Sequence, residues 1–169
     1  MEGIRILLPE DAETFRDIRL EGLLNSPESF GITHEEYQSR DIEVIRSGLN
    51  RTSDSFTLGT FDSENQMIGL VGFKQEQAIK FKHKGFIWGM YVNKPRYRSQ
   101  GVGKRLIIKV IEIAKQNKGL EQINLCVVVG NQNAKRLYES IGFKVYGIER
   151  RALKHNGIDY DEELMTLWL

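Results

Sequence analysis

Gln100-Gly101-Val102-Gly103-Lys104 stands directly before a strongly amphipathic helical pattern. The first N–H groups of a helix have no partner inside the helix and lie at the positive end of its dipole, so they form a site for an anion. Gly101 and Gly103 lack a Cβ atom, which lets a phosphate group approach the backbone closely. The stretch therefore predicts a phosphate-binding turn between a strand and a helix. A glycine turn that only closes such a junction is the alternative.

Two familiar nucleotide motifs are absent from this region. The dinucleotide fingerprint GxGxxG fails because Leu106 occupies its third glycine position. The GKS or GKT ending of a nucleotide P-loop is also missing. The phosphate-binding turn therefore has to be interpreted from its wider context.

The composition indicates one ordinary soluble domain over residues 1–169. Hydrophobic residues make up 40% of the chain and charged residues 28%. The net charge of +1 gives no general attraction to nucleic acid, and no apolar run reaches the roughly 18 residues of a membrane helix. A single cysteine, Cys126, excludes an internal disulfide and suggests a reducing, cytoplasmic location.

The hydrophobic pattern predicts an α/β (α+β) fold in which a mixed sheet carries helices on both faces. Apolar spacing predicts helices over residues 10–24, about 33–49, 103–115 and 131–140, with Asp41 as a cap inside the second. Strands are predicted over residues 4–8, 55–61, 66–74, 85–92, 123–129, 143–148 and 164–169. The continuous apolar run 123–129 indicates a central strand covered on both faces.

Two segments together resemble the GCN5-related N-acetyltransferase (GNAT) family. The family's acetyl-CoA motif, Arg/Gln-x-x-Gly-x-Gly/Ala, is matched by Arg98, Gly101 and Gly103. Its later signature is matched by Asn131, Ala134, Leu137, Tyr138, Gly142 and Phe143. The order of strands and helices resembles the family from Ile4 to the C-terminus. The resemblance implies a mostly antiparallel central sheet that is splayed at the cofactor site.

The resemblance also implies how acetyl-CoA is bound. Its diphosphate would lie on the main-chain N–H groups of residues 100–104, and its pantetheine arm would lie along a bulged strand over residues 86–92. The N–H of Tyr91 or Val92 would polarise the thioester carbonyl, which makes Tyr91 a catalytic candidate. The residues assigned to the cofactor are Met90, Tyr91, Val92, Arg98, Ser99, Gln100, Gly101, Val102, Gly103, Lys104, Asn131, Asn133 and Arg136.

Tyr138 is the second catalytic candidate. Amine attack on a thioester expels a thiolate, which leaves faster when it is protonated. A phenol with a pKa of about 10 is close enough to a thiol to give up that proton late in the reaction. The alternative is a tyrosine that packs on its helix and exposes its hydroxyl group.

The general base is left open by the sequence. Some members of the family carry a glutamate on the strand before the glycine turn, but Phe86, Ile87 and Trp88 occupy that region here. The remaining candidates are Glu28, Glu35, Glu36, Glu76 and a water relay.

No metal site and no covalent intermediate are expected. The three histidines show no metal-ligand spacing, and the apolar neighbours of Cys126 favour a buried thiol over a nucleophile. The resemblance therefore implies direct transfer of acetyl from acetyl-CoA to a primary amine of a small molecule or a protein N-terminus. A non-catalytic acyl-CoA-binding sensor or interaction module is the alternative. A homodimer is compatible with the resemblance.

Overall fold

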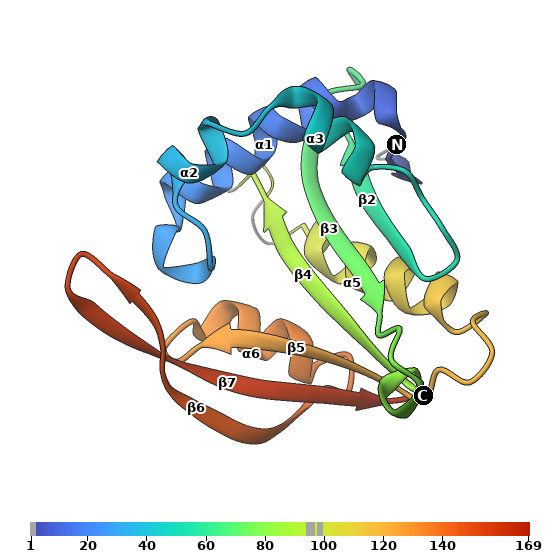
Figure 1. Cartoon of the computed structure of the whole chain (residues 1–169), viewed down its shortest axis with the longest axis vertical. Coiled ribbons are helices and arrows are strands. Elements are labelled where there is room, and N and C mark those ends of the chain that lie inside the picture. The colour runs from blue at the N-terminus through green and yellow to red at the C-terminus, as the bar shows by residue number, and fades with distance from the viewer. Residues whose placement is uncertain (1–2, 94–96, 98–99) are drawn as a thin grey trace.

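The computed structural model describes residues 3–93, 97 and 100–169 and contains one mixed β-sheet (Figure 1). The strands in the described ranges are β1 (Gly3–Ile6), β2 (Ser55–Phe61), β3 (Met67–Gln75), β4 (Lys84–Val92), β5 (Gln122–Val128), β6 (Lys144–His155) and β7 (Ile158–Trp168). Their order in the sheet is β1-β2-β3-β4-β5-β7-β6. Neighbouring strands are antiparallel except for β4 and β5, which are parallel. The predicted mixed, mostly antiparallel sheet is confirmed.

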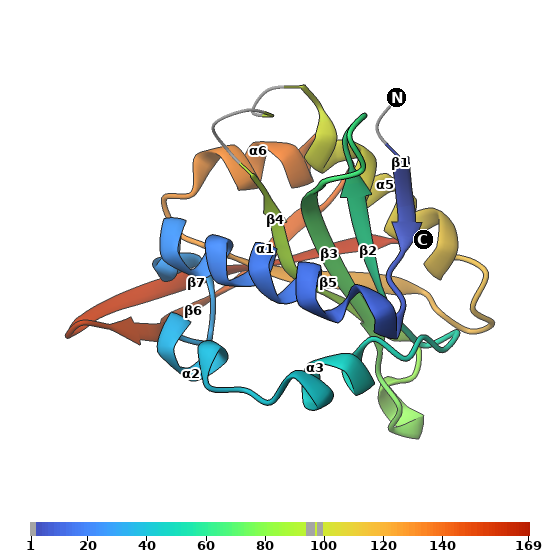
Figure 2. The same cartoon turned by 90° about the horizontal axis from the view of Figure 1, so that it is seen from above.

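Helices cover both faces of this sheet. They are α1 (Ala12–Asn25), α2 (His34–Gln38), α3 (Ile42–Gly48), α5 (Val102–Ala114) and α6 (Gln132–Glu139). Seen along the sheet, α1, α2 and α3 lie on one face, and α5 and α6 lie on the other (Figure 2). Each face therefore has its own hydrophobic core.

The α5 core follows from the apolar stripe in the sequence. Leu106, Ile107 and Val110 are fully buried, and they pack with residues of β2 to β5 such as Phe73 and Ile123. The second core lies under α1, where Phe15 and Leu23 pack with Leu70 and Tyr91 of the sheet. Burial of these side chains stabilises the two helical layers against the sheet.

The predicted helix over residues 33–49 is two short helices. Thr33 caps α2: its hydroxyl accepts from the Glu36 N–H at 3.2 Å, and the Glu36 carboxylate accepts from the Thr33 N–H at 2.9 Å. Asp41 caps α3 by accepting from the Glu43 N–H at 2.8 Å. The expected cap is confirmed, but it starts a new helix, because the backbone of Asp41 is extended and separates α2 from α3.

Strand β4 contains the bulge that the family resemblance implied. Trp88 pairs with Gly72 and Tyr91 pairs with Leu70, so Gly89 and Met90 of β4 stand opposite one residue of β3. Gly89 has a φ of +66°, a conformation that glycine adopts without strain. The extra residue shifts the alternation, so Trp88 and Tyr91 both pack toward α1 while Met90 packs toward α5.

The sheet separates beyond this point. β4 pairs with β5 only through Lys84–Phe86 and Gln122–Asn124, whereas β5 stays paired with β7 along its whole length. Figure 1 shows β4 and β5 diverging from their shared end. The predicted splay of the sheet is present in the structure.

The second half of the sheet differs from the sequence prediction in two ways. β6 and β7 are longer than the predicted strands 143–148 and 164–169, because the two strands stay paired as far as His155 and Ile158 through a stretch rich in charged residues. β5 is an interior strand, but only Ile123, Leu125 and Val127 are buried against the α5 core. Cys126 on the opposite face is half-buried, so that face is not fully covered.

Candidate active site

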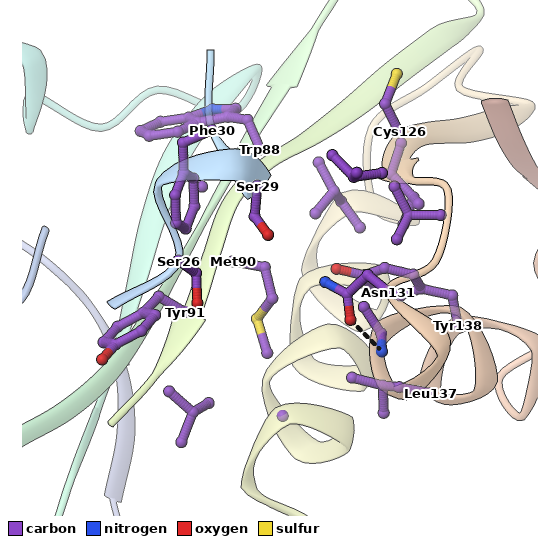
Figure 3. A pocket seen from close by; sticks show the side chains of 18 of the residues that line it. Ser26, Ser29, Phe30, Trp88, Met90, Tyr91, Cys126, Asn131, Leu137 and Tyr138 are labelled. Atoms are coloured by element: carbon purple, nitrogen blue, oxygen red, sulfur yellow. Dashed lines mark hydrogen bonds between the residues drawn. The ribbon is translucent and has the colours of Figure 1, made fainter. Parts of the chain in front are cut away.

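A cavity of about 670 Å³ fills the opening between β4 and β5. Its walls come from both faces of the sheet (Figure 3). On the α5 side it is lined by the start of α5 and by α6. On the α1 side it is lined by α1, by the segment that follows α1, and by β7. A ligand in this cavity therefore reaches through the sheet from one face to the other.

The start of α5 is built as the glycine turn predicted. Gly101 is the N-cap residue and has a left-handed φ of +74°. The first helical hydrogen bond joins the Arg105 N–H to the Gly101 carbonyl at 3.0 Å. The N–H groups of Val102, Gly103 and Lys104 therefore have no partner inside the helix, and these residues line the cavity.

The structure does not place the other three residues predicted at this turn in the cavity wall. Gln100 is described but does not line the cavity, and its carbonyl accepts from Arg105 Nη1 at 2.8 Å. Arg98 and Ser99 lie outside the described residues. Their predicted contacts with the diphosphate stay predictions.

Gly103 has a second role that the sequence did not indicate. A Cβ atom at this position would lie 2.9 Å from Met90 Cε and 3.2 Å from Leu137 Cδ2. The absent side chain thus lets α5 begin close to both β4 and α6. The turn is therefore a packing junction, in addition to its predicted role as an anion site.

The main chain of β4 offers polar groups to the cavity. Met90, Tyr91 and Val92 all line it. The N–H of Asn93 donates to the Ile68 carbonyl of β3 at 2.8 Å. Because N–H groups along a strand alternate in direction, the N–H of Tyr91 also points toward β3, and that of Val92 points toward the opening. Of the two oxyanion donors considered, this geometry favours Val92.

The side chain of Tyr91 points away from the reaction space. Its hydroxyl donates to Glu21 Oε1 at 2.8 Å and accepts from Asn25 Nδ2 at 3.0 Å, so it is bound to α1. Burial, together with the Glu21 carboxylate, raises the pKa of Tyr91 to about 12. The phenol of Tyr91 is therefore anchored to α1 by these two hydrogen bonds.

Tyr138 lies on α6 with its ring toward the cavity (Figure 3). The side chain is 7% exposed and packs edge-on against Phe143, with 5.9 Å between ring centroids. Burial raises the pKa of Tyr138 to about 12. No group of the described residues hydrogen-bonds its hydroxyl, so a protonated donor is available to a ligand. The alternative of a surface tyrosine with an exposed hydroxyl is wrong.

The three polar residues predicted on α6 divide into two groups. Asn131 and Asn133 line the cavity. Asn131 also caps α6, because its Oδ1 accepts from the Ala134 N–H at 3.2 Å. Arg136 is exposed, lies outside the cavity lining, and donates to the Gln132 carbonyl at 3.3 Å.

None of the four glutamates considered as the base lines the cavity. Glu36 caps α2, and its hydrogen bonds with Thr33 lower the pKa of this carboxyl. Glu76 follows β3 and hydrogen-bonds to Lys84, at the end of β4 far from the opening. Glu28 and Glu35 lie on short helical segments outside the lining residues.

The structure instead places Glu162 of β7 in the cavity wall. Glu162 pairs with Val128 on one side and with Glu149 of β6 on the other. Burial and the nearby Glu149 carboxylate raise the pKa of Glu162. No sequence signal identifies this residue, because Asp159, Asp161, Glu162 and Glu163 are indistinguishable before the strand register is known.

Arg19 of α1 is the second residue that the sequence did not indicate. It is 9% exposed and lines the cavity together with Phe30 and Trp88. Its position on the buried face of α1 between Phe15 and Leu23 was the available signal, since a charged residue seldom occupies such a face.

Cys126 lines the cavity and has a half-buried thiol. Burial, together with Glu162 and Glu149, raises the pKa of Cys126 to about 11. The thiol therefore stays protonated near neutral pH. In the described part of the chain, no group of three metal-ligating side chains is present, and no helix is long and apolar enough to cross a membrane.

The family model described as "Acetyltransferase (GNAT) domain" matches residues 4–164. The chain belongs to the GNAT acetyltransferase family. The predicted family membership is confirmed, and the bulge, the splay and the glycine turn are the parts of the family's fold that form this cavity.

Curated relatives match the GNAT chain over different lengths. A thialysine N-epsilon-acetyltransferase of Bos taurus is 42% identical over 57 residues, which cover 34% of this chain and 32% of that protein. The chain therefore spans about a third of the first curated relatives it matches. The uncharacterized N-acetyltransferase YokL of Bacillus subtilis (strain 168) is 25% identical over 160 residues, covering 94% of this chain and 84% of that protein.

Solved structures share the fold over the whole chain. A GNAT-family acetyltransferase from Streptococcus pneumoniae has a TM-score of 0.79 at 24% identity and covers 100% of both chains. YncA from Salmonella typhimurium, solved with its cofactor acetyl-CoA, has a TM-score of 0.83 at 18% identity and covers 99% of this chain and 94% of its own. These likenesses confirm the predicted fold class.

Proposed function

We propose that this GNAT chain transfers the acetyl group of acetyl-CoA directly to a primary amine of a small molecule or a protein N-terminus. One observation carries the proposal: a cavity that crosses the sheet joins an open helix N-terminus to a buried tyrosine hydroxyl. Acetyl-CoA would supply the acetyl thioester. The residues present fit this group, because Val102, Gly103 and Lys104 offer N–H groups and Gly103 leaves the close approach free.

The β4 main chain would hold the reacting end in place. Beyond Phe86 the edge of β4 is not paired with β5, so an extended amide chain can bind along it as an added strand. The N–H of Val92 points into this opening and would donate to the oxygen that becomes negative in the transition state. The adjacent Asn131 and Asn133 would line the same channel from α6.

Tyr138 would act as the general acid. Its hydroxyl is protonated at neutral pH, since burial raises its pKa to about 12, and it would donate to the departing sulfur. Burial that excludes water also disfavours a free thiolate, which favours transfer of this proton. The absence of a competing hydrogen bond from the described residues leaves the hydroxyl free to make this contact.

Glu162 would accept a proton from the amine. An alkylammonium group with a pKa near 10.4 must lose a proton before it attacks. Glu162 lies on the α1 side of the cavity, and its raised pKa makes it a better base than an exposed carboxylate. Its position beside Glu149 also favours a cationic amine over a neutral competitor.

The proposal is tested by release of free thiol from acetyl-CoA across a panel of amines, with the acetylated product identified by mass spectrometry. The expected result is turnover with at least one amine and a product heavier by one acetyl group. Tight binding of acetyl-CoA with no turnover on any amine would contradict the proposal and favour an acyl-CoA-binding sensor.

A further inference from the structure

Arg19 presents a buried positive charge that lacks an acidic partner. Its side chain is 9% exposed, and in the described part of the chain no carboxylate lies within ion-pair distance of it. Within residues 3–93, 97 and 100–169, its guanidinium makes one hydrogen bond, from Nη1 to the Gly89 carbonyl, and this bond is long at 3.4 Å. A buried charge is costly unless it is paired, so this arrangement calls for an explanation beyond packing.

Aromatic rings hold the guanidinium in a fixed position. Its central carbon lies 4.7 Å from the ring centroid of Phe30, 5.9 Å from that of Trp88 and 6.0 Å from that of Tyr37. The rings confine the cation but do not satisfy its hydrogen-bond donors. A guanidinium carries five N–H donors that point outward in its own plane, and the rings offer no acceptor atom in that plane. Burial also lowers the pKa of Arg19, which reflects the cost of this placement.

The charge borders the cavity on the side where an acceptor would enter. Arg19, Phe30 and Trp88 line the cavity from the face of the sheet covered by α1, whereas the diphosphate-binding turn lies on the α5 face. Figure 3 shows Phe30 and Trp88 at the end of the cavity away from Leu137 and Tyr138. An anion on Arg19 would therefore belong to the acceptor and not to the diphosphate.

The contact with Gly89 places the guanidinium beside the main chain that would hold the thioester. Gly89 directly precedes the main-chain stretch Met90–Val92, along which the thioester would bind. A Cβ atom on Gly89 would lie 2.9 Å from Arg19 Nη1, so the guanidinium lies directly over the bulge. The anionic group and the reacting amine must then be close together in one molecule.

We infer that Arg19 binds a carboxylate of the acceptor, so that the substrate is a small amino acid in which an amine and a carboxylate lie a few bonds apart. This inference rests on the proposed transferase function and narrows its acceptor class. The planar fork of Arg19 matches a carboxylate bidentately, and Glu162 on the other wall faces the ammonium end. Protein N-termini lack a carboxylate at this distance and become poor acceptors.

The test compares three versions of each acceptor with the unaltered chain: the amino acid, its primary amide, and the amine that lacks the carboxylate. Acetyl transfer is followed by thiol release and mass spectrometry. The acid form is expected to exceed the other two in kcat/KM by about 10- to 100-fold. Equal or better use of the amide or the simple amine would overturn the inference.

Variants then assign the preference to Arg19. Arg19→Met is expected to lower kcat/KM for the acid at least tenfold more than for the simple amine, so that the preference for the acid disappears, and Arg19→Lys is expected to keep part of that preference. Arg40→Met is the matched control, since Arg40 lies 5.3 Å from the Tyr37 ring but is exposed and outside this cavity. A uniform loss over all three acceptor forms in a folded Arg19→Met variant would show that Arg19 only supports the bulge and would overturn the inference.

A failure of the proposed transferase function can be distinguished from a failure of the inferred acceptor class. Acetyl-CoA affinity is measured by calorimetry on the same samples. Turnover with simple amines but with no amino acid overturns the acceptor class and leaves the transferase function standing. Acetyl-CoA binding without turnover of any acceptor overturns both.

Discussion

Met90 of β4 and Gly103 of α5 pack closely together: a Cβ atom on Gly103 would lie 2.9 Å from Met90 Cε. The contact depends on the bulge in β4, which turns Met90 toward α5. The strand that would hold the pantetheine arm and the helix that would hold the diphosphate are therefore in direct contact. Changes at this junction are expected to alter cofactor binding first.

The Gly103→Val variant is expected to lower acetyl-CoA affinity by more than tenfold. The branched side chain would push Met90 and Leu137 apart and would crowd the N–H groups at the start of α5. Isothermal titration calorimetry measures the effect. Gly48→Val is the matched control, because a Cβ atom there meets nothing within 4 Å. Equal affinities of the Gly103→Val variant and the unaltered chain would contradict the assigned cofactor turn.

The Gly89→Ala variant is expected to destabilise the bulge. Gly89 has a φ of +66°, where a non-glycine residue costs about 1–2 kcal/mol, and the new methyl group would press on Arg19. Urea unfolding measures the stability. Gly3→Ala is a control with open space around the new methyl group and no positive φ. A Gly89→Ala chain as stable as the control would contradict the requirement for glycine at this position of the bulge.

The Tyr138→Phe variant is expected to lower kcat by about 10²-fold or more, with acetyl-CoA affinity kept within about twofold. Only the hydroxyl is removed, and the ring stays packed on Phe143. Because the pKa of Tyr138 is raised to about 12, its ionisation should not appear in the pH–rate profile below pH 10. Unchanged turnover in this variant would remove Tyr138 from the acid role.

The Glu162→Gln variant is expected to lose turnover near neutral pH yet gain stability there. The folded pKa of Glu162 is raised above its unfolded value, so its charge costs stability above the unfolded pKa, and the cost disappears once the carboxyl is protonated at lower pH. The midpoint temperatures of thermal unfolding of the Glu162→Gln variant and the unaltered chain should therefore differ at pH 8 and converge near pH 4. Glu163→Gln is the contrasting change, since Glu163 accepts a 2.7 Å hydrogen bond from Lys135. A less stable Glu162→Gln chain at pH 8 would contradict the raised pKa.

The Cys126→Ser variant is expected to retain turnover within about threefold. The raised pKa of about 11 leaves too little thiolate for a covalent intermediate at neutral pH. Intact-protein mass spectrometry after incubation with acetyl-CoA should show no acetylated enzyme. A stable acetyl group on Cys126, lost in the variant, would indicate a two-step mechanism instead.

The sequence predicted the parts of the fold that local chemistry determines. The apolar stripe of α5, the cap at Asp41 and the glycine turn at Gly101 depend on neighbouring residues, and each is where it was expected. Tyr138 was found through its motif. These signals are local, so they can be read before any strand is paired.

The cavity wall on the α1 side, where the acceptor would bind, could not be predicted from local sequence patterns. Arg19, Phe30 and Glu162 come from α1, the segment after it, and β7, and they share one cavity only after the sheet has formed. Glu28, Glu35, Glu36 and Glu76 were considered because of their place in the chain, which does not show which way a carboxylate points. The strand register separates Glu162 from its acidic neighbours, and that register is a property of the folded sheet.

A crystal structure of the chain with acetyl-CoA tests the central claim most directly. The account predicts the diphosphate on the N–H groups of Val102, Gly103 and Lys104, and the thioester between β4 and β5 with its sulfur within hydrogen-bond distance of the Tyr138 hydroxyl. A cofactor bound outside this opening, or a sulfur remote from Tyr138, would contradict it.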